Sequence, residues 1–272
     1  MLEGQVAVVT GGGRGIGRSI AKELALRGAA VALMGRSLSH LQATAEEIEA
    51  AGGRALAIPC DVTAATEVTA ALAQSDKELG PLTLLVNNAG VADGGRLWEM
   101  PAEDWWRVIE VNLKGPFLVS HAALPGLVAR GTGRIINIGS YAANSAGMGG
   151  SAYSTSKAAL QRLTEGIAAD LEGTGVTALA FSPGFVWTDM GNDYDRFLRA
   201  NVPTYEGMAD DWVFPPQVAA NFCARLAAGD ADALSGRLLH VRDDLDKMIA
   251  KAQQIADDEL YTLRLTQPED SA

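Results

Sequence analysis

Apolar residues along the chain fall into two alternating patterns. Short continuous apolar runs, such as Gln5–Thr10 and Leu82–Asn87, are typical of strands buried on both faces of a parallel sheet. Longer segments between them, such as Ile16–Arg27, carry apolar residues at intervals of about three or four, which predicts amphipathic helices. The expected strands are Gln5–Thr10, Ala30–Met34, Ala55–Cys60, Leu82–Asn87, Arg134–Ile138, Val176–Phe181 and Gly236–Val241. The expected helices are Ile16–Arg27, Ser39–Ala51, Ala64–Leu79, most of Met100–Arg130, Ala152–Leu171 and one starting near Pro216.

This alternation of strand and helix predicts an α/β fold: a Rossmann-like, doubly wound, seven-stranded parallel sheet with helices on both faces. In such a sheet the carboxyl ends of the strands deliver their loops to one edge, where ligands bind. One domain is expected over residues 1–243, with a lid over about residues 185–215.

A C-terminal helical tail is expected over residues 244–272, because apolar residues recur there at helical intervals. The tail could dock on its own domain, on a neighbouring subunit or over the ligand pocket. Its apolar positions are Leu245, Met248, Ile249, Ala252, Ile255 and Ala256.

A glycine-rich turn joins the first expected strand to the first expected helix. Its glycines allow the backbone to approach a pyrophosphate closely, and the helix N-terminus supplies unpaired N–H groups. A plain strand-to-helix turn is the alternative, but the complete strand–helix–strand unit favours dinucleotide binding. The residues of the turn are Gly11, Gly13, Arg14, Gly15, Ile16 and Gly17.

The end of the second strand bears on which dinucleotide binds. Folds that prefer NAD place a carboxylate there, whereas this chain has Gly35-Arg36-Ser37. Arg36 can pair with a 2′-phosphate, and Arg14 could add a second positive charge. The sequence therefore predicts NADP rather than NAD, unless Arg36 is an ordinary solvated residue. Asp61, after the third strand, either accepts the adenine amino group or caps the following helix.

A Tyr and a Lys four residues apart, Tyr153 and Lys157, open an expected helix after the fifth strand. This spacing places both on one helix face, where the ammonium can favour the ionised phenol. Ser140 lies upstream at the end of the strand. Phenol, ammonium and hydroxyl together suit proton transfer to or from a carbonyl oxygen.

Composition excludes several classes of function. With 22 Lys and Arg against 33 Asp and Glu, the net charge of −11 argues against general binding to nucleic acid or an anionic membrane. No apolar run reaches membrane-spanning length and no signal-type segment opens the chain, so a cytoplasmic protein is expected. Cys60 and Cys223 form no paired motif and are expected to be buried. No metal site is expected, since His40, His121 and His240 lack ligand spacing.

Taken together, these motifs resemble the single-domain branch of the short-chain dehydrogenase/reductase family over roughly residues 2–241. The resemblance rests on all of the motifs occurring together in the family's order and at its spacing, because each motif alone is a weak signal. It implies a nicotinamide cofactor, reversible carbonyl–alcohol chemistry and often a homotetramer. The matching positions are Thr10-Gly11-x-x-x-Gly15-x-Gly17, Asp61, Asn87-Asn88-Ala89-Gly90, Asn112, Ser140, Tyr153-x-x-x-Lys157, Pro183-Gly184 and Thr188.

The resemblance also implies roles for individual residues. Tyr153 is expected to be the general acid and base, Lys157 to lower the phenol pKa and hold the nicotinamide ribose, and Ser140 to bond the substrate oxygen. Asn112 would anchor a proton-relay water, the alternative being that it only kinks a long helix. Further implied cofactor contacts are Asp61, Val62, Asn88, Ala89, Gly90, Pro183, Gly184, Val186 and Thr188. The expected substrate pocket comprises Tyr141, Asn144, Met148, Phe185 and Trp187.

Two segments depart from the family pattern. After the seventh strand the family usually has Val-Asp-Gly-Gly, whereas this chain has His240-Val241-Arg242-Asp243-Asp244 and then the tail. The lid is rich in aromatic residues although the whole chain is only 6% aromatic, which suits either an apolar substrate pocket or packing of the lid against the domain or a subunit. These aromatic residues are Trp187, Tyr194, Phe197, Tyr205, Trp212 and Phe214.

The resulting hypothesis is an oxidoreductase that transfers a hydride between NADP(H) and a ketone or secondary alcohol. Its partners would be that small molecule and further copies of the chain, as a tetramer or dimer. The alternatives are an NAD-linked alcohol dehydrogenase and a non-catalytic NADP(H)-sensing regulator, although retention of Ser140, Tyr153 and Lys157 argues against the regulator. The sequence leaves the substrate and the physiological direction open.

Overall fold

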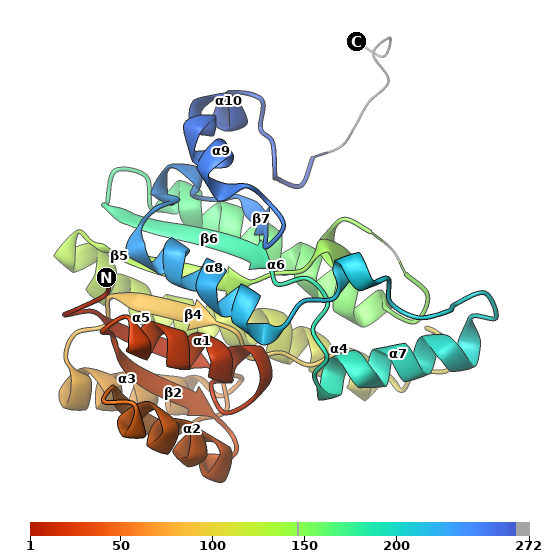
Figure 1. Cartoon of the computed structure of the whole chain (residues 1–272), viewed down its shortest axis with the longest axis horizontal. Helices are drawn as coiled ribbons and strands as arrows, with labels where there is room; N and C mark the ends of the chain where they lie inside the picture. The colour runs from red at the N-terminus through yellow and green to blue at the C-terminus, as the bar shows by residue number, and fades with distance from the viewer. Residues whose placement is uncertain (146, 265–272) are drawn as a thin grey trace.

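A parallel sheet of seven strands, in the order β3-β2-β1-β4-β5-β6-β7, runs through the centre of the structure (Figure 1). The structure is a computed structural model and describes residues 1–145 and 147–264. Each half of the sheet extends outward from the neighbouring strands β1 and β4, so the order reverses there and opens a crevice at the carboxyl edge. The strands are β1 (Val6–Thr10), β2 (Ala30–Gly35), β3 (Arg54–Pro59), β4 (Leu84–Asn87), β5 (Gly133–Ile138), β6 (Val176–Ser182) and β7 (Leu238–His240).

Helices cover both faces of the sheet, because successive strand residues point to opposite sides. Val9 belongs to one core, with the buried faces of α1, α2 and α8, while its neighbour Val8 belongs to a second core with α3, α5 and α6. The principal helices are α1 (Gly15–Leu26), α2 (Leu38–Ala50), α3 (Ala65–Leu79), α4 (Ala102–Ile109), α5 (Gly115–Arg130), α6 (Ser151–Asp170), α7 (Asp189–Asn201) and α8 (Pro216–Ala228).

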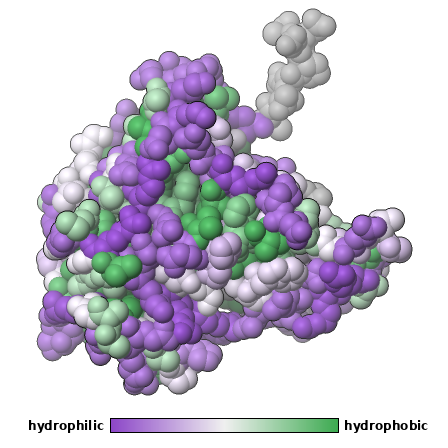
Figure 2. All heavy atoms as spheres, viewed as in Figure 1, coloured by the Kyte–Doolittle hydropathy of each residue, from purple (hydrophilic) through white to green (hydrophobic). Residues whose placement is uncertain are grey.

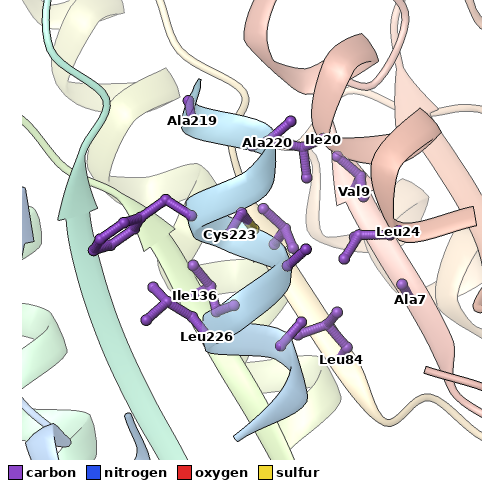
Figure 3. Packing of buried hydrophobic residues seen from close by; sticks show 14 of the residues in the cluster. Ala7, Val9, Ile20, Leu24, Leu84, Ile136, Ala219, Ala220, Cys223 and Leu226 are labelled. Atoms are coloured by element: carbon purple, nitrogen blue, oxygen red, sulfur yellow. The ribbon is translucent and has the colours of Figure 1, made fainter. Parts of the chain in front are cut away.

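The first core is centred on α8, whose small residues let it lie close to the sheet. Figure 3 shows Ala220 and Cys223 of α8 beside Ile20 and Leu24 of α1, with Ile136 of β5 beneath them. These side chains are all buried, and Cys223 fills space as a small apolar residue. The expectation that both cysteines are buried is confirmed.

The long helix expected over Met100–Arg130 is interrupted. A π-helical segment, η1 (Glu110–Lys114), separates α4 from α5. Asn112 lies in this segment, and its side chain bonds the backbone of Val91 instead of facing solvent. These bonds tie the segment to the loop after β4 at the point where the regular α-helix is interrupted.

The lid contains a helix that the sequence pattern did not predict, α7, which projects from the body of the molecule (Figure 1). Its aromatic residue Phe197 packs between two glycines, Gly94 and Gly149, where any Cβ would collide with the ring. Gly149 also has a positive φ of 72°, which favours glycine. The glycines therefore let α7 lie directly on two loops, the one after β4 and the one between β5 and α6.

The tail folds as two short helices, α9 (Leu245–Ala250) and α10 (Ala252–Asp257), against its own domain. Leu245, Met248 and Ile255 join the first core, whereas Ala256 is exposed, contrary to the expected apolar face. The chain then returns to the edge of the sheet, where the Leu238 N–H donates to the Tyr261 carbonyl at 2.9 Å. Residues 265–272 of the expected tail lie outside the described residues.

Surface character agrees with this packing. Figure 2 shows apolar residues gathered near the centre of one face, framed by hydrophilic residues over α2, α7 and the α9–α10 pair. Among the helices within residues 1–145 and 147–264, none combines the length and the apolar character needed to cross a membrane.

Candidate active site

Ser140 and Tyr153 meet at the carboxyl edge of the sheet. Ser140 follows β5 and precedes a short 3-10 turn, η2 (Tyr141–Ala143), while Tyr153 lies in the first turn of α6. The Ser140 Oγ accepts the Ala142 backbone N–H at 3.1 Å, and the Ser140 side chain is close enough to the Tyr153 phenol to act on its pKa. The structure therefore brings two of the three expected chemical groups together.

Lys157 lies one helical turn after Tyr153 and is buried. Its Nζ donates to the Ile138 carbonyl at 2.8 Å and lies 5.6 Å from the centre of the Tyr153 ring. Burial lowers the pKa of the ammonium to about 8. The end of β5 thus holds the ammonium next to the phenol.

The direction of the Tyr153 pKa differs from the expectation based on spacing alone. Burial raises the pKa of the phenol, and the hydrogen bond with Ser140 opposes that rise without reversing it. The Lys157 Nζ is directed to the Ile138 carbonyl, and burial sets the direction of the Tyr153 shift. In this structure the phenol therefore keeps its proton at neutral pH.

Asn112 is buried below these residues, and its amide is fully used by protein partners. The Oδ1 accepts the Val91 N–H at 2.8 Å, while the Nδ2 donates to the Val91 carbonyl at 2.8 Å and to Ser156 Oγ at 3.0 Å. Ser156 Oγ donates in turn to the Tyr153 carbonyl at 2.7 Å. The side chain thus braces the first turn of α6 against the loop after β4.

The glycine turn is held in place by β1 and the loop after β4. Asn88 Nδ2 donates to the carbonyls of Thr10, at 2.9 Å, and Gly11, at 3.3 Å. The Thr10 Oγ1 accepts the backbone N–H groups of Asn88 and Ala89, each at 3.0 Å. A Cβ on Gly17 would collide with Asn88, so this glycine is required for packing. Thr10 was not among the expected site residues, although it opens the matched motif.

Other cofactor candidates lie around the same crevice. Arg36 and Ser37 are exposed after β2, whereas Val62 is buried in the second core against Gly115. Asp61 does not cap α3, whose N-cap is Ala64.

Asp61 instead closes a turn with Thr63, accepting its N–H at 2.9 Å and its hydroxyl at 2.8 Å. These bonds, with the charges of Arg36 and Lys114, lower the pKa of Asp61 although burial opposes the shift.

The start of the lid lies on the glycine turn. Thr188 caps α7 by accepting the Gly191 N–H at 3.3 Å, and its methyl group would touch a Cβ placed on Gly15. Arg14 forms an ion pair with Asp189 at 2.7 Å, an interaction that the sequence did not predict. Pro183 and Val186 are buried between these points, while Gly184 has a φ of 70° and lies under the Phe214 ring.

The expected substrate residues are dispersed along this edge. Tyr141 stacks on His240, Phe185 packs edge-on against Trp187 at 4.9 Å, and Met148 is exposed. Asn144 ends the η2 turn by donating its N–H to the Tyr141 carbonyl.

Several lid aromatics pack against the domain or within the lid. Phe197 lies on glycines, and the Tyr205 hydroxyl donates to Asp195 at 2.8 Å. A cavity of about 420 Å³ beside α7 is lined by residues of the 93–107 segment with Phe197 and Asn201, and none of the expected substrate residues contributes to it.

A buried polar network beneath the site was missed by the sequence reasoning. Asn87 Nδ2 donates to Ser120 Oγ at 3.0 Å and to Asn137 Oδ1 at 2.9 Å, and Asn137 Nδ2 donates to Thr164 Oγ1 at 2.8 Å. The signal was one asparagine in each of two mostly apolar strands, Asn87 in β4 and Asn137 in β5. Within the described part of the chain, no group of His, Cys, Asp or Glu side chains is arranged to hold a metal ion.

Comparison with known proteins identifies the family. Residues 5–198 match the family model described as short chain dehydrogenase. A short chain dehydrogenase of Pseudocercospora fijiensis is 35% identical, covering 97% of this chain and 90% of that protein. The 3-oxoacyl-[acyl-carrier-protein] reductase of Vibrio cholerae is 37% identical, covering 88% and 96%.

Among solved structures, a 7 alpha-hydroxysteroid dehydrogenase complexed with NADH and 7-oxo glycochenodeoxycholic acid is 30% identical. It has a TM-score of 0.78, with 88% of this chain and 93% of that chain covered. The chain therefore belongs to the short-chain dehydrogenase/reductase family of NAD(P)-dependent oxidoreductases.

Proposed function

We propose that the protein transfers a hydride between NADP(H) and a ketone or secondary alcohol, with Tyr153 as the general acid and base. The observation that carries this proposal is the contact between the Ser140 hydroxyl and the Tyr153 phenol, with the buried Lys157 ammonium beside them. Together these side chains can give a proton and a correctly placed hydrogen bond to the same substrate oxygen.

The glycine turn fits a dinucleotide. Arg14, at the N-cap of α1, makes no side-chain capping bond, and the first turn of the helix carries no acidic residue. Backbone N–H groups and the positive end of the helix dipole are therefore free to bind phosphate. Gly15, which faces Thr188, would lie against the bound cofactor, and Thr188 would close over it from the lid, while Gly17 lets the helix pack on Asn88.

Preference for NADP rests on the charges near β2. Arg36 is exposed at the end of that strand, and no carboxylate occupies residues 35–37. Arg14 is also exposed, and its pair with Asp189 is 68% and 75% exposed, so it contributes at most about 1 kcal/mol and can be exchanged for a phosphate.

The proposed mechanism assigns each group a position. The nicotinamide supplies or accepts the hydride when bound. Ser140 Oγ–H donates to the substrate oxygen, and in reduction the Tyr153 Oη–H bond breaks as its proton passes to the same oxygen. Because its pKa is about 8, Lys157 is mostly charged at pH 7 and stabilises the phenolate that remains. In oxidation the phenolate removes the alcohol proton.

Relatives support the substrate class. One is named for reducing a 3-oxoacyl group, and a solved relative is complexed with a 7-oxo steroid derivative. The chemistry shared by these names is that of a ketone and its alcohol. Exposed apolar side chains on α4 and α5, Trp106, Phe117 and Val128, support a homo-oligomer, a tetramer or dimer, which sedimentation analysis would test.

Replacing Tyr153 by Phe tests the proposal. The variant lacks only the phenolic oxygen, so Kd for NADPH should stay within about two-fold while kcat falls by roughly 10²–10⁴. Tyr261→Phe, on the tail, is the matched control and should behave as wild type. Normal turnover by the Tyr153 variant would refute the assignment of the acid. Tight NADPH binding by wild type without turnover of any carbonyl compound would favour a regulator.

A further inference from the structure

The end of β7 carries a histidine that the proposed chemistry does not use. His240 is 1% exposed and lies in register with Ser182 of β6. The Ser182 Oγ accepts the Tyr141 backbone N–H at 3.3 Å. His240 therefore lies at the same edge of the sheet as the turn that follows Ser140.

Three aromatic rings enclose its imidazole. Tyr141 stacks on it, with ring centroids 4.6 Å apart and planes inclined by 22°. Trp212 and Phe214 meet it edge to face, with centroids at 5.8 and 6.1 Å. Tyr141, Trp212, Phe214 and His240 are called the His240 cluster below.

The His240 cluster joins the Ser140 turn to the lid. Tyr141 directly follows Ser140, whose Oγ accepts the Ala142 N–H. Phe214 lies on Gly184, and its backbone N–H donates to the Phe185 carbonyl at 2.8 Å. The imidazole therefore contacts both the segment that carries the Ser140 hydroxyl and the segment that closes the base of the lid.

The hydrogen bonds of the ring require its neutral form. The Nδ1 accepts the Arg242 backbone N–H at 3.0 Å, so the ring proton is on Nε2, which is buried without a partner among the described residues. Burial and the Arg242 charge lower the pKa of His240 to about 4.

Two neighbouring charges are already paired with other groups. The Arg242 guanidinium lies over the Trp212 ring at 4.8 Å and 3.5 Å from Asp211, while Asp243 accepts the His240 backbone N–H at 2.7 Å. The Tyr141 phenol is also neutral, because burial raises its pKa.

We propose that His240 is a positioning residue for the reaction: its uncharged ring holds Tyr141, and through Tyr141 it directs the Ser140 hydroxyl toward the substrate oxygen. This inference rests on the proposed function, since it assumes that Ser140 acts on a substrate. An aliphatic residue could fill the same core space, but it would offer no flat face to Tyr141.

The kinetics of two His240 variants distinguish the effect of the stacked aromatic ring from the effect of side-chain volume. His240→Ala should lower kcat by about ten-fold or more, because a displaced reacting group loses orientation, while Kd for NADPH stays within about two-fold. His240→Phe keeps the stacked ring and should recover kcat to within about three-fold of wild type. The matched control is His121→Ala, since His121 is exposed on α5 beside Phe117 at 5.6 Å.

Hydrogen exchange tests the positioning without any substrate. Amides of residues 140–144 should exchange faster in His240→Ala than in wild type or His121→Ala. If His240→Ala speeds this exchange but wild type turns over no carbonyl compound, the proposed function is rejected, while the conclusion that His240 positions the turn still holds. Unchanged exchange, wild-type kcat in His240→Ala, or a His240→Phe variant as slow as His240→Ala would each overturn the inference.

If His240→Ala does not fold, Tyr141→Leu removes the other half of the stack from a partly exposed position. The same loss of kcat with retained NADPH binding is then expected. A Tyr141→Leu variant with the kcat of wild type would overturn the inference.

Discussion

Replacing Lys157 by Met should make the cofactor-free protein more stable at neutral pH while abolishing its turnover. The ammonium is buried and donates to the Ile138 carbonyl. Methionine has a similar length and no charge to bury. Turnover should fall by roughly 10²–10⁴ because the charge that stabilises the phenolate is lost.

The pKa of Lys157 supplies the magnitude. A change from 10.5 to about 8 on folding corresponds to about 3 kcal/mol of destabilisation at pH 7. Loss of the bond to Ile138 offsets about 1 kcal/mol, which leaves the variant more stable by about 2 kcal/mol. The penalty is fully present below about pH 8 and absent above 10.5, because the unfolded chain binds more protons between those values. Most of the variant's advantage should therefore disappear by about pH 9.5.

Urea denaturation at pH 7 and pH 9.5, at one protein concentration, measures the free energy of unfolding of the variant and of wild type, and shows how their difference changes with pH. Lys77→Met on α3 is the control, since its side chain is 82% exposed and should change stability by no more than about 0.5 kcal/mol. The reasoning fails if the Lys157 variant is less stable than wild type at pH 7. It also fails if the difference does not shrink as the pH rises.

Three further changes test the cofactor crevice and the lid. Arg36→Ala should weaken NADPH binding by about ten-fold or more and leave NADH within about two-fold; equal losses for both would show that Arg36 is not the selector. Asp189→Asn frees Arg14 and should tighten NADPH binding by up to about five-fold in fluorescence titration, whereas weaker binding would contradict an exchange of partners. Gly149→Ala, at a φ of 72° and against Phe197, should cost about 2 kcal/mol or more in thermal unfolding. Phe197→Leu in the same chain should recover part of that loss, and an unaltered Tm for Gly149→Ala would refute the contact.

The local sequence pattern was sufficient to predict the architecture and to identify the candidate reactive side chains. Continuous apolar runs and helical spacing predicted the parallel sheet, because burial on both faces imposes those patterns directly on the sequence. Ser140 and Tyr153 were predicted to share one site because one ends a strand and the other opens the next helix. The structure brings their side chains together at the carboxyl edge.

Tertiary contacts decided what spacing could not. The sequence placed Lys157 near Tyr153, but burial at the base of the site set the direction of both pKa values. The sequence left two roles open for Asp61, an adenine contact or a helix cap; in the structure its carboxylate accepts the Thr63 N–H and hydroxyl, and Ala64 is the N-cap of α3.

The sequence by itself therefore determined the fold and the family and named the candidate reactive groups, since these depend on local periodicity and on motifs read in order. Only the tertiary structure decided that Phe197 packs on Gly149, that the tail covers its own domain and that His240 is enclosed by aromatic rings. The physical reason is the same in each case. Burial, hydrogen-bond partners and pKa depend on residues that lie far apart along the chain and become neighbours only when the sheet and its helices are packed.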